Sequence, residues 1–186
     1  MSGQIARRYF TVDEYHRMGE AGVFTEDDHV ELLEGEILMM SPIGSRHAAS
    51  VNRLHMDLTM LLRGRAIVSV QNPVVLNDFS EPEPDIAILR RRDDFYAPAL
   101  PRATDVLLVI EVADTSVEYD RDIKLPAYAG SAVSEVWLVD LLADTVTVHA
   151  DPANGVYRAV KSYQRSDSIT PLHFPDLSID VVSILG

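Results

Sequence analysis

The stretch Val106-Leu107-Leu108-Val109-Ile110-Glu111-Val112-Ala113 decides the fold, because it is apolar almost throughout and yet contains one acid. Such an apolar run is typical of a central strand covered on both faces of a sheet. A carboxylate in such a strand is costly to bury unless a cation or hydrogen-bond donors satisfy it. Glu111 is therefore the residue whose position most strongly indicates a function.

The elements on either side of this strand mix helices with hairpins. A capping box at Thr11-Val12-Asp13-Glu14 predicts a short helix through Met18. Residues 30–40 predict a hairpin with its turn at Glu34-Gly35, and periodic apolar residues predict a helix over 46–63. The other expected elements are a strand region at 66–76, a strand after Asp85, a helix over 119–129 that Pro126 kinks or divides, strands at 135–140, 145–150 and 156–163, and a short strand with a closing turn in 169–185.

This order predicts an α/β protein with a mixed central sheet flanked by helices, preceded by an N-terminal helix and hairpin. At 186 residues, a single domain spanning 1–186 is expected. No apolar run approaches the roughly 18–20 residues of a membrane span, and residues 1–10 lack the apolar segment of a signal peptide. The absence of cysteine excludes disulfides and thiolate metal sites. We therefore expect a cytoplasmic protein with no membrane partner.

The charge of the chain is unusual for a protein that acts on nucleic acid. Sixteen Lys and Arg residues stand against 29 Asp and Glu residues, for a net charge of −13, whereas nucleic-acid binders usually present a basic surface. A DNA substrate would need a local basic patch or a metal ion. Arg90-Arg91-Arg92 is the basic run, and a solvated loop after a strand explains it more simply than a DNA contact.

Two carboxylates and one ammonium group form the candidate site. Asp85 stands at the start of one strand and Glu111 lies in the next, with Lys124 beyond them. Carboxylates suit a hard cation such as Mg²⁺, and a lysine holds a phosphate or a water, so the set suits metal-dependent phosphodiester cleavage. Ordinary roles also fit: Asp85 as a solvent-facing strand end, and Asp120 with Lys124 as an ion pair on a helix surface.

Glu36 and His47 are further candidates that spacing alone would not select. Glu36 also suits the exposed face of a hairpin. His47, four residues before Val51, also suits the start of a helix, bonded to the backbone.

Six segments recur in a specific order: Glu-Gly-Glu-Ile (34–37), Ser-Pro (41–42) with His47, Glu-Pro-Asp-Ile (83–86), Val-Ile-Glu-Val-Ala-Asp-Thr-Ser (109–116), Tyr-Asp-Arg-Asp-Ile-Lys-Leu-Pro-Ala-Tyr (119–128) and Glu-Val-Trp-Leu-Val-Asp (135–140). Together they resemble the Uma-two family of restriction endonuclease-like proteins, within the PD-(D/E)XK nuclease superfamily. The likeness extends from about Phe10 to Leu185.

The resemblance implies a restriction-endonuclease-like fold and Mg²⁺-dependent cleavage of DNA, with Mn²⁺ as a possible substitute. It matches Asp85 to the motif aspartate and Glu111 to the motif acid of the superfamily. The lysine usual two residues after that acid is replaced by Ala113, and Lys124 on the following helix matches the lysine of this family. Glu36 and His47 also match marked family positions.

We therefore predict that Asp85, Glu111 and the Val112 carbonyl hold a divalent cation. Lys124 then positions the attacking water or stabilises charge on the phosphorus. His47 or Glu36 would orient the site or add a ligand.

DNA is the expected substrate, and a homodimer is expected because superfamily nucleases that cut both strands commonly act as dimers. Four apolar residues of the N-terminal third could form its interface or belong to the core: Val23, Phe24, Leu32 and Met39. Two other functions stay open. One is a catalytically inactive nuclease fold used for binding or dimerisation, which the acidic charge favours. The other is a metal-dependent hydrolase of small phosphoesters.

Overall fold

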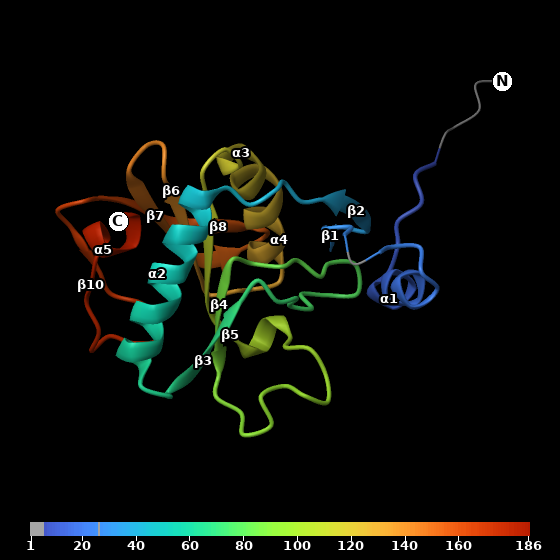
Figure 1. The fold of residues 1–186 in the computed structure, drawn as a ribbon, viewed down its shortest axis with the longest axis horizontal. Helices are drawn as coiled ribbons and strands as arrows, with labels where there is room; N and C mark the ends of the chain where they lie inside the picture. The colour runs from blue at the N-terminus through green and yellow to red at the C-terminus, as the bar shows by residue number, and fades with distance from the viewer. Residues whose placement is uncertain (1–5, 26) are drawn as a thin grey trace.

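The computed structural model describes residues 6–25 and 27–186, so the first half of the segment tested for a signal peptide lies outside the described residues. A six-stranded mixed sheet of order β3-β4-β5-β6-β7-β8 forms its centre (Figure 1). β5 and β6 run parallel and the other neighbours antiparallel. The strands are Ala66–Val70, Ile86–Arg90, Val106–Ala113, Glu135–Asp140, Thr145–Ala153 and Val156–Gln164. The predicted mixed α/β sheet is confirmed.

One face of the sheet is covered by α2 (Ser45–Leu62) and the short α5 (Val181–Leu185) (Figure 1). Val51, Leu54 and Leu58 form the apolar stripe of α2. All three are buried against the sheet. Ser45 is the first helical residue, and Gly44 takes the cap position.

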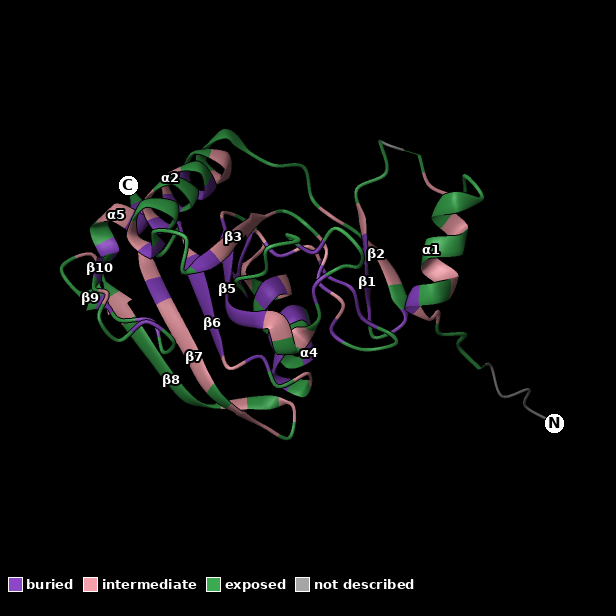
Figure 2. Cartoon of the chain, turned by 90° about the horizontal axis from the view of Figure 1, so that it is seen from below, coloured by how far each residue is buried: buried purple, intermediate pink, exposed green. Residues whose placement is uncertain are grey.

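β5 is buried along its whole length (Figure 2). Its side chains alternate between two apolar clusters: Leu108 and Ile110 face the cluster under α2, and Val109 and Ala113 face the opposite cluster. Glu111 shares the second parity and therefore points away from α2, toward the crossover connection that follows β5.

That crossover links the parallel strands β5 and β6 and is divided as Pro126 predicted. It consists of α3 (Val117–Tyr119), a π-helical turn (Asp120–Lys124) and α4 (Leu125–Gly130). The Leu125 N–H reaches back five residues to the Asp120 carbonyl. Because proline has no N–H and its ring crowds the carbonyl four residues earlier, a widened turn relieves the clash. Such turns are frequent at functional sites.

The N-terminal arm, residues 10–40, stands to one side of the sheet (Figures 1 and 2). It contains α1 (Val12–Glu20), β1 (Val30–Leu33) and β2 (Glu36–Met39). The predicted capping box is present, with Thr11 and Glu14 exchanging bonds of 3.1 and 3.2 Å. The turn between the strands has φ of 49° at Glu34 and 78° at Gly35, as a two-residue hairpin requires.

The arm is tied to the sheet through its apolar residues. Leu33 joins the cluster on the α4 side, and Leu32 is fully buried, so Leu32 is core rather than dimer interface. Phe24 is half-buried, whereas Val23 and Met39 are exposed.

The chain ends differently from the expected strand and turn. β9 (Ser168–Ile169) pairs with β10 (Ile179–Asp180), and the closing segment is the helix α5. The loop before β5 contains a 3₁₀ turn, Ala103–Asp105. None of the helices in the described residues is long and apolar enough to cross a membrane.

Candidate active site

Asp85 and Glu111 meet where β4 begins beside the end of β5. The antiparallel register pairs Ile86 with Ile110, so the residue before β4 lies beside the residues after 110. The Asp85 N–H donates to Glu111 Oε2 at 3.3 Å, and the Val112 N–H donates to Asp85 Oδ2 at 2.9 Å. The structure thus brings the two predicted acids and Val112 together.

Lys124 joins these acids from the π-helical turn. Its Nζ lies 3.3 Å from Glu111 Oε1 and 3.4 Å from Glu31 Oε2, and its side chain is 7% exposed. Asp120 is also buried, and its Oδ2 accepts a bond from the Ser116 hydroxyl at 2.9 Å. The alternative of an ion pair on a helix surface is therefore wrong for Lys124 and Asp120.

His47 reaches the same place from the first turn of α2. Its Nε2 lies 2.9 Å from Asp85 Oδ2, so it bonds a carboxylate rather than the backbone. This hydrogen bond raises the pKa of His47, although burial acts in the opposite direction. Nδ1 is buried and has no hydrogen-bond partner in the described part of the chain.

Glu36 and the basic run lie elsewhere. Glu36 is exposed on β2, and its Oε1 pairs with Arg7 at 2.9 Å. Arg90-Arg91-Arg92 lies at the far end of β4 from Asp85. Arg90 and Arg91 donate to loop carbonyls and Arg92 pairs with Asp94, as the loop interpretation predicted.

Two buried residues of the site were missed by sequence reasoning. Glu31 on β1 is fully buried, and its carboxylate accepts bonds from the Tyr119 hydroxyl at 2.8 Å and the Glu83 N–H at 3.0 Å. The Tyr128 hydroxyl on α4 donates to Glu111 Oε1 at 2.6 Å. Glu31 had a usable signal, because it is an acid inside the apolar strand Val30–Leu33, as Glu111 is inside β5.

The cluster holds more acid than base. Glu31, Asp85, Glu111 and Asp120 surround one ammonium group. The pKa of Glu111 is raised to about 8, chiefly by burial. Lys124 opposes this rise, whereas Asp120 and Asp85 contribute to it. Burial alone would lower the pKa of Lys124, but the surrounding carboxylates outweigh burial and raise it. Lys124 therefore stays protonated beside these carboxylates.

The donor set suits a hydrated divalent cation. Asp85 and Glu111 offer hard oxygen ligands, and Asp85 Oδ1 makes one side-chain contact in the described residues, a 3.4 Å approach of the Gln71 amide. Residues 6–25 and 27–186 contain no group of three or more His, Cys, Asp or Glu side chains arranged to enclose a metal. Mg²⁺ needs no such cage, because it keeps several waters and uses one or two carboxylates.

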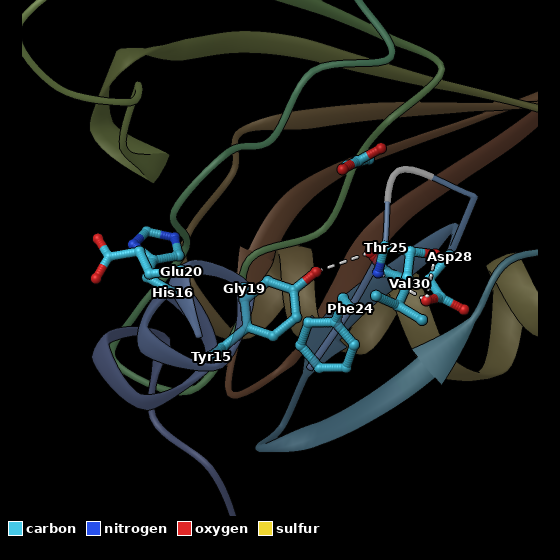
Figure 3. A pocket seen from close by; sticks show the side chains of 9 residues that line it. Tyr15, His16, Gly19, Glu20, Phe24, Thr25, Asp28 and Val30 are labelled. Atoms are coloured by element: carbon cyan, nitrogen blue, oxygen red, sulfur yellow. Dashed lines mark hydrogen bonds between the residues drawn. The ribbon is translucent and has the colours of Figure 1, made fainter. Parts of the chain in front are cut away.

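A separate open pocket lies beside α1 (Figure 3). Within it the Tyr15 hydroxyl donates to the Val30 carbonyl at 2.8 Å, and the Asp28 carboxylate caps Thr25. Its lining residues are Tyr15, His16, Gly19, Glu20, Phe24, Thr25, Asp28, Val30 and Glu83. Neither predicted acid nor Lys124 is among them, so the candidate active site is not this pocket.

Comparison with known proteins identifies the family. Residues 12–182 match the model of the Uma2 family, described as "Putative restriction endonuclease". A solved structure of "a putative nuclease belonging to DUF820" from Anabaena variabilis superposes with a TM-score of 0.74. It is 15% identical and the match covers 95% of this chain and 97% of that one, so it shows a shared fold. No curated protein matches the sequence. This chain, with its nuclease-like fold, belongs to the Uma2 family of restriction endonuclease-like proteins.

Proposed function

We propose that this protein is a metal-dependent endonuclease that hydrolyses phosphodiester bonds of DNA, with Mg²⁺ as its cation and Mn²⁺ as a substitute. One observation carries the proposal: Asp85 and Glu111 lie together at adjacent strand ends, with the buried ammonium of Lys124 beside them. Membership of the Uma2 family and the nuclease-like fold support it.

Each residue has a distinct role in this proposal. Asp85, Glu111 and the Val112 carbonyl would hold the cation, which when bound polarises the phosphoryl group and lowers the pKa of a bound water. The Lys124 ammonium stabilises negative charge that develops on the phosphoryl oxygens. His47 fixes the orientation of the Asp85 carboxylate through Nε2.

The charge of the site makes the cation a requirement of this function. Four carboxylates face one ammonium, and the chain as a whole carries a net charge of −13. A DNA phosphate would be repelled from such a site unless a divalent cation lay between. We therefore expect cleavage to depend strictly on added metal.

The proposal treats the chain as one functional domain, because Leu33 of the arm packs in the same cluster as residues of β4 and β5. Cutting of both strands would use two copies of the chain, with exposed Val23 and Met39 as candidate contacts. A sedimentation run showing only monomer at micromolar concentration, with or without DNA, would remove the dimer from the proposal.

Cleavage of supercoiled plasmid and of single-stranded DNA, with Mg²⁺, Mn²⁺ or EDTA, tests the function. Asp85→Asn and Glu111→Gln should each lower the rate at least about a hundredfold. Glu81→Gln is the matched control, because Glu81 is also a buried acid but pairs with His16, and it should cleave normally. Full metal-dependent cleavage by both site variants would refute the assignment.

Calorimetry separates the other two functions. An absence of heat with Mg²⁺ and Mn²⁺, together with no cleavage, would favour a nuclease fold retained for binding. Turnover of a model phosphodiester without affinity for DNA would favour a hydrolase of small phosphoesters.

A further inference from the structure

Glu31 is the most completely enclosed carboxylate beside the candidate site, and it comes from the arm rather than from the sheet. Its side chain is fully buried. Oε1 accepts the Tyr119 hydroxyl at 2.8 Å, and Oε2 accepts the Glu83 N–H at 3.0 Å and lies 3.4 Å from Lys124 Nζ. Donors from three segments therefore lock the position of this carboxylate.

Lys124 needs such an anchor because its backbone lies in the π-helical turn rather than in the sheet. Position 113, two residues after Glu111 on the rigid strand β5, is an alanine, and the ammonium arrives instead on a flexible four-carbon stem from the π-helical turn. Two carboxylates hold it, Glu111 at 3.3 Å and Glu31 at 3.4 Å. The Tyr119 ring lies 5.9 Å away and adds a weaker attraction.

The two carboxylates are not equivalent. Glu111 also accepts bonds from Tyr128 and the Asp85 N–H and is a candidate ligand for the cation. Glu31 contacts Tyr119, Glu83 and Lys124. In the described residues its carboxylate makes no hydrogen bond or ion pair with Asp85 or His47. A divalent cation bound to Glu111 would offset the negative charge of this carboxylate and so weaken its attraction for Lys124. The contact between Lys124 and Glu31 would remain.

We propose that Glu31 is a positioning residue that holds the Lys124 ammonium in the active site, so that the N-terminal arm completes the site. The inference rests on the proposed function for its catalytic meaning, but the contact itself is testable without activity. The competing explanation is that Glu31 only fastens the arm to the sheet.

Amine labelling measures the position of Lys124 directly. The chain has two lysines, Lys124, which is buried, and Lys161, which is exposed on β8. Acetic anhydride labelling followed by mass spectrometry of peptides therefore gives a ratio with an internal reference. In Glu31→Gln we expect the Lys124-to-Lys161 ratio to rise about tenfold, because the ammonium loses a charged partner.

Leu32→Ala separates positioning from attachment of the arm. Leu32 is the next residue of β1 and is fully buried, so its truncation loosens the arm without touching Lys124. We expect little change in the labelling ratio of this variant. An equal rise in Leu32→Ala and Glu31→Gln, or no rise in Glu31→Gln, would overturn the inference.

Folding is checked by emission from Trp137, the single tryptophan, which lies in the cluster on the far face of the sheet. Should Glu31→Gln not fold, Tyr119→Phe replaces it, because it removes the hydroxyl that orients Glu31 and keeps the carboxylate. That variant should raise the ratio about threefold, and an unchanged ratio would count against the inference.

Cleavage kinetics provide the second readout. Glu31→Gln should lower kcat about tenfold with little change in KM, and the double variant with Lys124→Met should cleave no more slowly than Lys124→Met alone. Additive losses would overturn the inference. If the wild type does not cleave DNA but Lys124 is exposed selectively in Glu31→Gln, the proposed function fails and the positioning contact stands. If the wild type cleaves DNA but the Lys124-to-Lys161 labelling ratio is unchanged in Glu31→Gln, the proposed function stands and the positioning role of Glu31 fails.

Discussion

Two buried carboxylates near the arm bind basic side chains in different ways. Glu81 faces His16 alone, with both carboxylate oxygens 2.8 and 2.9 Å from Nε2, and His16 is 44% exposed. Glu31 faces Lys124 inside a sealed cluster that also contains Glu111 and Asp120. The first contact is one acid with one base at the edge of water, whereas the second leaves acid in excess.

These two contacts have different costs for the stability of the fold. A matched pair beside water costs little, because solvent satisfies whatever the partner does not. Several carboxylates in the interior repel one another and lose their hydration, and both effects destabilise the folded state. Sites that hold such an excess are retained for function rather than for folding. A divalent cation, which supplies two positive charges, is the group that would balance it.

Lys124→Met should produce the largest loss of stability. The substitution keeps the length of the side chain but leaves the buried Glu31 carboxylate without its cation, at a cost of about 3 kcal/mol. Glu111, whose pKa burial raises to about 8, keeps its proton at neutral pH and adds little to this cost. Urea unfolding at neutral pH in EDTA measures it. A loss below about 1 kcal/mol would mean that the cluster is hydrated and resembles the Glu81 contact after all.

Glu111→Gln should change the pH dependence of stability. Burial raises the pKa of Glu111 from 4.5 to about 8, so the folded protein keeps a proton that the unfolded chain releases. This stabilisation is complete below pH 4.5 and is lost as pH rises toward 8. Between pH 5 and 6.5 the wild type should lose about 2 kcal/mol more than the variant in EDTA.

Mg²⁺ supplies the control for that experiment. At pH 8 it should raise the unfolding temperature of the wild type, because it binds the folded state, and should leave Glu111→Gln almost unchanged. A wild type that gains stability relative to the variant between pH 5 and 8 without metal would reverse the assigned sign.

The fold was predictable where local patterns are strong. The apolar run Val106–Ala113 and the alternation around it predicted a buried central strand, and Pro126 predicted the divided crossover. The helix α5 was not predicted, because five residues form a stable helix only through packing, here of Ile184 and Leu185 against the sheet cluster.

The site was predictable only in part. Asp85 and Glu111 carry signals in their own strands, and their meeting follows from the antiparallel register. The bond of Tyr128 to Glu111 depends on how the π-helical turn directs α4, and Glu31 depends on how the arm docks. Both contacts are set by tertiary geometry between distant segments, which spacing in one sequence does not encode.

His47→Asn should have a smaller effect that depends on pH. The hydrogen bond to Asp85 raises the pKa of His47 above 6.5. Its stabilisation is therefore present below pH 6.5 and is lost as pH rises through the raised value. The variant should lose about 1 kcal/mol at pH 6 and much less at pH 9, measured as paired thermal unfolding curves. An equal loss at both values would show that His47 contributes by packing rather than by charge.

Glu81→Gln should have the smallest effect on the free energy of unfolding, because the Glu81 contact lies beside water. The amide keeps the shape of the carboxylate and still bonds a neutral imidazole, and burial already raises the pKa of Glu81 toward the uncharged form. We expect a change in unfolding free energy below about 1 kcal/mol and normal affinity for Mg²⁺ in calorimetry. A weakened affinity for Mg²⁺ would mean that Glu81 influences Asp85 through the extended segment Glu81-Pro82-Glu83-Pro84. The charges of Glu81 and Glu31 would then both act on the candidate active site.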